Sequence, residues 1–281
     1  MRKAIPLLAG LALLFLAGAA GAAPCRYSAP RNVDLDATAL SSLLLNLGAA
    51  DAHVQGVAGL SQVQIRGTAC ASNPQWLNDL RIDTSHTGGK ATVTVRTGDH
   101  ENSFNLAGIS RYAYMKLSVS VPAQLAVAID SGSGDVIAES VESLDFHSGS
   151  GDLKADHIGG ALALDLGSAD VDAHGVGNVE LRGTGSGDVT VSDVHGDVRA
   201  DHAGSGNLHF SDVQGGVSLG SIGSGDLRLE RIGRNVQVDS IGSGDLVVDG
   251  VDGDLQVGAT GSGDVSYHGV KGTVHVPRDA D

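Results

Sequence analysis

The stretch SIGSGDLRLERIGRNVQVDSIGSGDLVVDGVDGDLQVGATGSGDV, from Ser221 to Val265, carries nearly the same repeat more than twice over. Its motif, Gly-Ser-Gly-Asp followed by an aliphatic residue, recurs along the chain, with GSAD and GSGN as divergent copies. The period lengthens from 17 near the first copy to 19 near the last, and the copies begin at Gly132, Gly149, Gly167, Gly185, Gly204, Gly223, Gly242 and Gly261. Such a period is typical of a solenoid, in which each repeat is one coil.

Aliphatic residues recur at fixed positions after each motif. In one copy they are Leu227, Leu229 and Ile232. The step of two between the first pair is the period of a strand with one buried face. A turn containing glycine or asparagine follows, and then a second alternating pair, Val236 and Val238 in this copy. Each coil is therefore predicted to contain two short strands joined by two turns.

The Gly-Ser-Gly corners must superimpose from coil to coil. We expect their glycines to adopt positive φ angles, which other residues reach only with strain. We expect the next residue to cap the turn by accepting hydrogen bonds from nearby backbone N–H groups. These repeat-turn residues are Asp135, Asp152, Asp170, Asp188, Asn207, Asp226, Asp245 and Asp264.

The sequence therefore predicts an all-β protein, a right-handed parallel β-helix of about eight coils of 17–19 residues. Right-handed crossovers are the rule between parallel strands. An α-helical alternative is disfavoured, because each glycine costs about 1 kcal/mol in a helix relative to alanine. The left-handed hexapeptide helix is also disfavoured, because the Ile-Gly pairs at 222, 232 and 241 lie 10 and 9 residues apart rather than 6.

Four segments are predicted: a signal peptide (1–22), a β-rich N-terminal capping region (23–121), the GSGD-repeat solenoid (122–276) and a polar tail (277–281). In the capping region SQVQIRG, ATVTVRTG and YMKLSVSVP alternate as strands, and ALSSLLLNLGAADAHVQGV suggests a helical turn before a strand. The region is expected to cover the unpaired edge of the first coil. At the other end, Pro277, Arg278 and Asp281 are expected to block further strand addition.

The N-terminus indicates export. Arg2 and Lys3 precede the apolar run AIPLLAGLALLFLAG, and small residues then favour cleavage after Ala22. Cleavage would change the formal charge from −15 to −17, because it leaves 33 acidic residues and two fewer basic ones than the original 18. The mature protein is expected to be periplasmic or secreted and to have no membrane span.

Export also favours a disulfide between the two cysteines, Cys25 and Cys70. A lipidated Cys25 is the alternative, although AAPC places Pro24 where lipoprotein signals carry a Leu-Ala-Gly-Cys-like box. Zinc binding is disfavoured, because no CxxC or HxxxH spacing occurs.

The acidic balance argues against nucleic acid and against anionic lipid as partners, because no basic face could neutralise phosphate groups. The chain has no Walker-type phosphate loop, and its repeated serines do not form a nucleophile elbow. Its histidines fall at different offsets within the coils. No catalytic residue and no cofactor are predicted.

Repeated glycine and aspartate also occur in calcium-binding nonapeptide solenoids, whose period is nine residues rather than 17 to 19. Stacked carboxylates repel each other, so backbone N–H groups or a weakly held cation must offset the repulsion. The weak candidates for a cation site are Asp226, Asp245 and Asp264.

The segment LSVSVPAQLAVAIDSGSGDV, Leu117 to Val136, together with the repeated GSGDV/L, resembles a bacterial exported adhesin family. Its β-solenoid domains of unknown function are known as head-GIN or "putative auto-transporter adhesin" domains. The resemblance covers about Val33 to Val276 and implies an envelope or surface protein that binds or senses something. It carries over no catalytic residues, and the chain shows no translocating barrel.

We therefore expect a non-enzymatic exported cell-envelope protein, an adhesin or binding scaffold that contacts an envelope polymer or protein through the solenoid faces. The alternatives are a polysaccharide-processing β-helix enzyme and a calcium-binding solenoid. An enzyme should show one non-repeating cluster of acids and bases in a cleft, whereas a scaffold should show only repeated columns.

Overall fold

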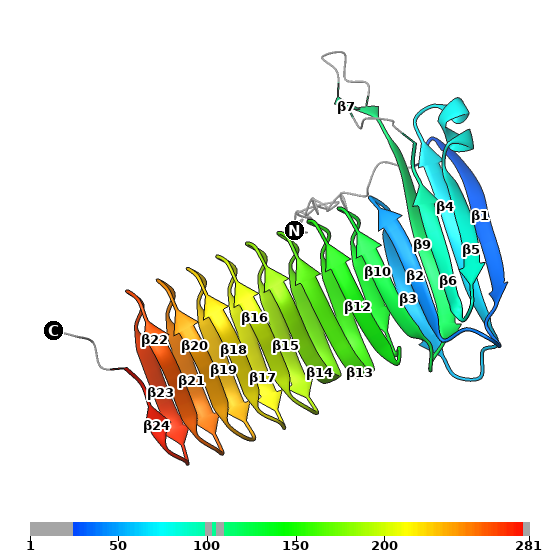
Figure 1. Ribbon diagram of the computed structural model, residues 1–281. Coiled ribbons are helices and arrows are strands. Elements are labelled where there is room, and N and C mark those ends of the chain that lie inside the picture. Colours follow the sequence, from blue (N-terminus) through cyan, green and yellow to red (C-terminus); the bar gives the residue numbers. More distant parts are fainter. Residues whose placement is uncertain (1–24, 99–102, 105–109, 278–281) are drawn as a thin grey trace, which may run out of the picture.

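The computed structural model describes residues 25–98, 103–104 and 110–277. They form an all-β solenoid of about eight turns that continues into an N-terminal cap (Figure 1), which confirms the predicted fold class. The signal peptide predicted for residues 1–22 lies outside the described residues, as do Arg278 and Asp281. In the part that is described, no helix is long and apolar enough to cross a membrane.

Each coil contributes one strand to each of two facing sheets, called here sheet 1 and sheet 2. Sheet 1 consists, from the cap onward, of β1 (Tyr27–Asp36), β4 (Gln62–Ala71), β9 (Ala113–Pro122), β3 (Asp51–Val57), β11 (Val136–Glu139), the first halves of β13 (Leu153–Leu166) and β14 (Val171–Thr184), β15 (Val189–Val194), β17 (Leu208–Val213), β19 (Leu227–Ile232), β21 (Leu246–Val251) and β23 (Val265–Val270).

Sheet 2 consists of β5 (Arg81–Thr87), β6 (Lys90–Arg96), β2 (Ser42–Gly48), β10 (Ala126–Ser131), β12 (Ser143–Ser148), the second halves of β13 and β14, β16 (Val198–Ala203), β18 (Val217–Ile222), β20 (Val236–Ile241), β22 (Leu255–Thr260) and β24 (Val274–His275). The 3-10 helix η1 (Pro74–Asn78) and a small hairpin, β7 (Ser103–Phe104) and β8 (Ser110–Arg111), lie beside the cap.

The core is a continuous aliphatic layer between the two sheets. Strands of successive coils pair in parallel and in register, so that Leu208, Leu227 and Leu246 lie directly above one another. Each of these side chains is 1% exposed or less, whereas Arg228 faces solvent. The inward and outward positions predicted from the repeat are therefore confirmed.

The cap contains a coil that the repeat count does not reveal. β2 and β3 meet at a corner, Gly48–Asp51, and pair in parallel with β10 and β11. Its sequence, GAAD, lies far ahead of the first GSGD motif at Gly132, because the segment from β4 to β9 is inserted between them. The helical turn suggested for this region is wrong: Leu43 and Leu45 alternate inward along β2.

The strands predicted over 61–67, 91–98 and 114–122 are present as β4, β6 and β9. Antiparallel pairing of β1 with β4 and of β5 with β6 ends both sheets at this side. The predicted disulfide joins Cys25 to Cys70, with Cα atoms 5.7 Å apart, and ties the start of β1 to the end of β4.

The glycines of the GSGD corners serve close packing rather than positive φ, so the expected reason is wrong. None of them has a φ in the left-handed region. Instead, a Cβ on Gly225 or Gly244 would lie less than 3.0 Å from the carbonyl oxygen of the equivalent glycine in the coil before. In one corner Ala169 occupies the position of the second glycine, so a methyl group is accepted there. Buried hydroxyls complete three corners, because Ser131, Ser148 and Thr184 each donate to a glycine carbonyl three residues on.

Left-handed residues lie instead on sheet 1, from β11 onward, directly before the third inward residue of each coil, and in the first of these coils that position directly follows β11. This left-handed column consists of Ser140, His157, Gly175, Asp193, Asp212, Arg231, Gly250 and Gly269. A left-handed residue reverses the strand's alternation once, which explains the step of three residues between the second and third inward positions. Five of the eight are not glycine, so these coils hold a conformation that L-residues adopt at a cost.

We expect Leu219→Asp, at a position 1% exposed in β18, to lower the unfolding free energy by about 3 kcal/mol or more, because the carboxylate would be buried without a partner. The matched control is Ser218→Asp, one residue earlier and exposed, which should stay within about 0.5 kcal/mol of the wild type. Equal melting shifts for the two variants would contradict the assignment of the two faces.

The left-handed column predicts opposite effects for two serine-to-glycine changes. Ser140→Gly, at φ 57°, should raise the unfolding free energy by up to about 1 kcal/mol, because it relieves backbone strain. Ser133→Gly lies in a GSGD corner outside the left-handed region and should lower it by about 0.5–1 kcal/mol through added chain entropy. Chemical denaturation of both variants tests the difference in sign.

Candidate functional site

The acidic residues of the GSGD corners form a ladder between coils. The Oδ1 atom of each accepts a hydrogen bond from the backbone N–H of the equivalent residue in the next coil, as Asp226 does from Asp245 at 2.9 Å. The same bond links Asp51 to Asp135 and continues along the column to Asp264. The expected cap is therefore a bond across coils rather than within one turn.

Asn207 takes part in this ladder like its acidic neighbours. Its backbone N–H donates to Asp188 at 2.8 Å, and its side-chain oxygen accepts from Asp226 at 2.9 Å. The column therefore requires an acceptor oxygen at each step rather than a negative charge.

A second ladder, which the sequence reasoning missed, lies at the opposite corner. Asn178 accepts from the N–H of Asp197, and Asp197 accepts from Gly216. Further along, Asn235 accepts from Asp254, whose carboxylate accepts from Thr273. The turns GDV, RNV and GDL contain the signal for it, because each has Asn or Asp directly before the inward aliphatic residue.

The cation candidates Asp226, Asp245 and Asp264 lie on the first ladder. Among the residues that the structure describes, no group of three or more His, Cys, Asp or Glu side chains could hold a metal ion.

The outer face of sheet 1 carries a network of ion pairs on β17 and β19. The Arg231 guanidinium contacts both carboxylate oxygens of Asp212, at 2.5 and 2.8 Å, and also Glu230 at 3.0 Å. Arg228 hydrogen-bonds the same Glu230, whose side chain is only 17% exposed. These contacts lower the pKa of Asp212, mainly through Arg231, and that of Glu230, mainly through Arg228. The two arginines are thus neutralised within the protein.

Sheet 2 contains a β-bulge at Arg182. Leu164 of β13 pairs with Leu181 of β14, but Asp165 pairs with Gly183, so Arg182 is an extra residue. Its guanidinium reaches back over β13 and binds both carboxylate oxygens of Asp145 in β12, at 3.0 and 3.1 Å. From β14 to β20 the last two inward side chains of each sheet 2 strand are three residues apart, whereas in β12 and β13 they are two residues apart.

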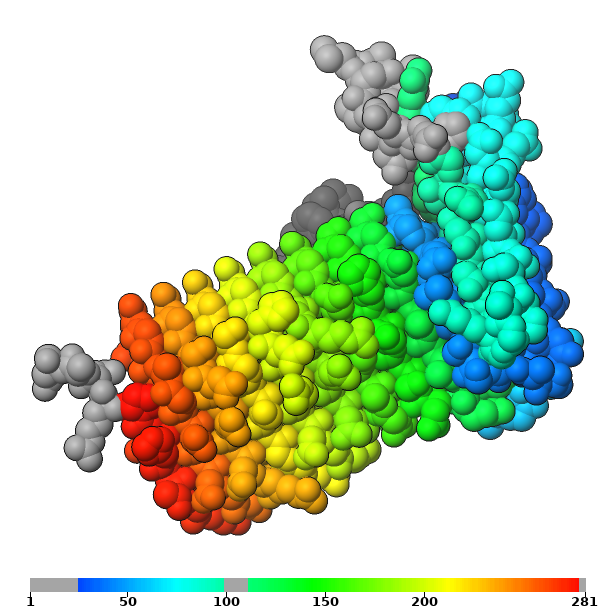
Figure 2. All heavy atoms as spheres, in the orientation of Figure 1, coloured from blue at the N-terminus to red at the C-terminus, as the bar shows by residue number. Residues whose placement is uncertain are grey.

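A groove of about 550 Å³ lies where these strands meet the GSGD corners. This corner groove crosses the ends of β13, β14, β16 and β18, so it runs along the solenoid axis. Its lining consists of Asp165, Leu166, Gly183–Gly185, His202–Gly204 and Ser221–Gly223. The N–H groups of Gly185, Gly204 and Gly223 donate to carbonyl oxygens of the coil before, and the absence of a side chain at these glycines keeps the floor low. Figure 2 shows the coils beside one another as regular ridges over the whole length of the solenoid.

The outer face of sheet 2 beside this groove is uneven in charge. Its outward residues on β14 and β16 include Glu180, Arg182, Arg199 and Asp201, whereas those on β18, β20 and β22 include Ser218, Gly220, Gln237, Asp239, Gln256 and Gly258. An interface core is typically depleted of charged residues, because burying an unpaired charge is costly. The part over β18, β20 and β22, where Asp239 is the one charged outward residue, is therefore better suited to a buried contact than the ion-paired face of sheet 1.

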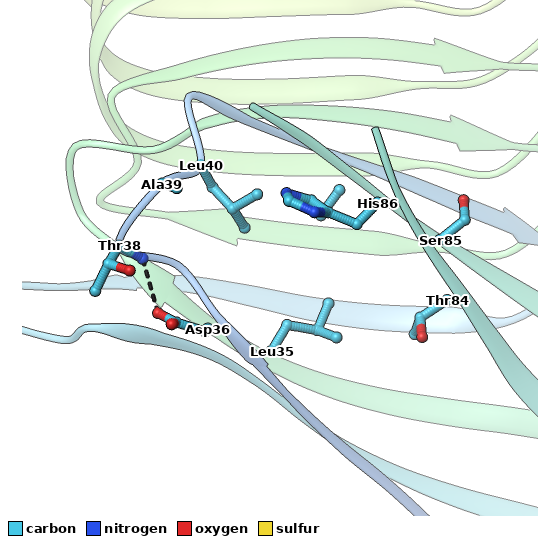
Figure 3. Close-up of a pocket in the computed structure, with 9 residues that line it drawn as sticks. Leu35, Asp36, Thr38, Ala39, Leu40, Thr84, Ser85 and His86 are labelled. Atoms are coloured by element: carbon cyan, nitrogen blue, oxygen red, sulfur yellow. Dashed lines mark hydrogen bonds between the residues drawn. The ribbon is translucent and has the colours of Figure 1, made fainter. Parts of the chain in front are cut away.

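The cap holds a separate pocket of about 350 Å³ between the end of β1 and β5 (Figure 3). Leu35, Leu40 and Ala91 give it an apolar floor. Asp36 lies at its edge and accepts a hydrogen bond from the Thr38 N–H, which lowers the Asp36 pKa. A carboxylate stabilised in its charged form is a weak general base.

A family model described as Toastrack DUF4097 matches residues 61–240. This confirms the family resemblance found in the sequence. No curated protein matches the chain.

Crystal structures similar to the chain include two from one organism and one from another. A "putative lipid binding protein" from Parabacteroides distasonis ATCC 8503 is 15% identical, with a TM-score of 0.50, over 85% of this chain and 96% of its own. A "putative adhesin" from the same organism is 10% identical, with a TM-score of 0.49, over 85% and 97%. A "putative adhesin" from Bacteroides fragilis NCTC 9343 is 16% identical, with a TM-score of 0.40, over 89% and 97%. At such identities the likeness shows the fold alone.

The first ladder predicts that the stability of the fold depends on an acceptor oxygen at each step more than on a negative charge. Asp226→Asn should leave the unfolding free energy within about 0.5 kcal/mol of the wild type, because Asn207 already makes the same bonds. Asp226→Ala should lower it by about 1 kcal/mol, because the N–H of Asp245 loses its acceptor. Denaturant titration distinguishes the two outcomes.

Calcium should raise the melting temperature of the wild type only slightly and without fixed stoichiometry. Tight calcium sites in calorimetry that disappear in Asp226→Asn would instead assign the protein to the calcium-binding solenoids.

Proposed function

The chain belongs to the Toastrack DUF4097 family, and we propose that it is a non-enzymatic exported envelope protein, an adhesin-like scaffold that binds an extended, uncharged partner chain along the corner groove and the adjoining outer face of sheet 2. The observation that carries the proposal is the direction of the groove. It crosses four successive strand ends, so it offers a partner that runs parallel to the solenoid a surface of similar shape at each coil.

The charge distribution supports an uncharged partner. With a formal charge of −15, the protein repels polyanions such as polyuronates. The groove lining carries no lysine or arginine to attract one, and Arg182 beside it is bound by Asp145. Neutral polysaccharide or an uncharged protein segment fits these conditions, and the exposed side chains of His202 and Ser221 in the lining would supply hydrogen bonds.

An enzyme is the weaker alternative. The acidic residues of the two corner ladders repeat in columns, and those beside Arg231 and Arg182 are engaged in ion pairs. The cap pocket does combine His86 with Asp36, but Asp36 caps its own turn. Export is supported by the basic and apolar N-terminal residues and by the Cys25–Cys70 disulfide, which is typical of an oxidising compartment.

Binding of the mature protein to envelope fractions and to a panel of neutral polysaccharides tests the proposal. Ser221→Trp places a large side chain in the groove at an exposed position and should weaken binding at least tenfold. Thr190→Trp, exposed on the outer face of sheet 1, is the matched control and should bind like the wild type. Both variants should keep the wild-type melting temperature.

Equal binding by the two variants would contradict the groove as the contact surface. Shortening of a polysaccharide during incubation would favour the enzyme instead.

A further inference from the structure

The cap pocket lies at the end of the layer between the two sheets. On β6, Ala91 and Val93 point into the core and are at most 2% exposed. Their partners on β5 are His86 and Thr84, and opposed residues of an antiparallel pair lie on the same face of the sheet. His86 and Thr84 therefore lie on the inner face of sheet 2, yet both are exposed, since they line the pocket instead of packing against sheet 1.

The wall that faces these two residues is apolar. Leu35 of β1 lies opposite the buried Val63 of β4, so it points inward from sheet 1. Leu40 follows it in the lining, and Figure 3 shows Leu35, Leu40 and His86 around one space. The pocket, of about 350 Å³, therefore offers an apolar surface to a side chain that enters from outside.

The backbone of the same β5 residues points toward an open edge. The Gly89 carbonyl accepts an N–H from β2 and so faces that strand. By alternation, the backbone of Thr92 faces β5, where it is paired with Ser85. Thr84 and His86, on either side of Ser85, therefore point their N–H and C=O groups away from β6. Among the described strands, β5 pairs only with β6, so these groups face no other strand.

This edge lacks features that usually protect the edges of sheets. The strand that ends sheet 1, β1, contains Pro30, and Arg31 ties it to η1 by donating to the carbonyl oxygens of Leu77 and Leu80, at 2.5 Å each. In contrast, β5 contains neither Pro nor Lys, and its register with β6 has no bulge. Of the two strands that end the sheets at the cap, β5 is thus the one that can accept a further strand.

The pocket also carries a negative charge at its edge. The Asp36 side chain is exposed, and no Lys or Arg of the described chain pairs with it. Its hydrogen bond from the Thr38 N–H holds the Asp36 pKa below the ordinary value, so the carboxylate stays charged near neutral pH. Together with the formal charge of −15, this favours a basic group in the partner.

We propose that an extended peptide adds to β5 as a further strand of sheet 2, with an apolar side chain in the cap pocket and a Lys or Arg on the same face beside Asp36. Strand addition satisfies the backbone groups of Thr84 and His86. It also turns every second side chain of the peptide toward the pocket. The site lies in the cap, apart from the corner groove, so each can be tested without the other.

Fluorescence anisotropy of the mature protein with short synthetic peptides tests this proposal. The probe alternates leucine with threonine, and one of its leucines is replaced by lysine. It should bind saturably. A copy with an N-methylated backbone keeps the side chains but not the N–H donors, and it should bind at least about tenfold less tightly. A copy with serine in place of the leucines should lose affinity as well, because the pocket then stays unfilled.

Variants of the protein locate the site. Ala39→Trp fills the pocket from an exposed turn and should weaken binding at least about tenfold. Ala58→Trp, in another exposed turn, is the matched control and should bind like the wild type. Asp36→Asn keeps the acceptor for the Thr38 N–H, and it should weaken binding of the lysine peptide about threefold while leaving a lysine-free peptide unaffected.

Amide hydrogen exchange distinguishes strand addition from a ligand that only fills the pocket. In the free protein the N–H groups of Thr84 and His86 should exchange fast and that of Ser85 slowly, because only Ser85 is bonded to β6. The bound peptide should slow exchange at Thr84 and His86 at least about tenfold. A small amphipathic ligand in the pocket would leave both fast.

No saturable binding of the leucine–threonine–lysine peptide would overturn the proposal. So would equally tight binding of the N-methylated copy with unchanged exchange on β5, because the pocket would then be a site for a small apolar ligand. Equal losses in Ala39→Trp and Ala58→Trp would mean that the peptide binds elsewhere.

Discussion

The distance between stacked backbones is the constraint on which the rest of this structure depends. Parallel hydrogen bonds hold successive coils about 4.8 Å apart, and at the GSGD corners that separation leaves no room for a Cβ over the carbonyl oxygen below. The glycines of the corners follow from it, and their lack of side chains lowers the part of the groove floor that they form.

Much of the solenoid was predictable because every coil repeats the same pattern of inward and outward residues. The two-residue step from Leu227 to Leu229 identifies a half-buried strand wherever it occurs, and stacking copies the same pattern into every coil. The reason for the glycines was not predictable from one coil, because the clash involves the coil below it. The left-handed column was not predicted, because Ser140, Asp193 and Arg231 share a backbone conformation but no side-chain chemistry that a sequence pattern would show.

The candidate groove illustrates what a repeat conceals. It lies where a single extra residue, Arg182, shifts the register between β13 and β14, and the coils that follow keep this register. The period does not reveal the extra residue, because the copies that begin at Gly149 and Gly167 are both 18 residues long: β14 has one residue fewer than β13 in the turn before. The coil of β2 and β3 was hidden differently, since GAAD ends at Asp51, well before the regular repeat begins.

That inserted segment has a consequence for the order in which the molecule can assemble. From Gly132 onward each strand pairs with one about 19 residues away, so these contacts are local, and small loops close at little entropic cost. β2 and β3 must instead wait for β10 and β11, which are synthesised later and lie far along the chain. The C-terminal coils are therefore the natural nucleus, and growth proceeds backward against the direction of synthesis until the cap closes last.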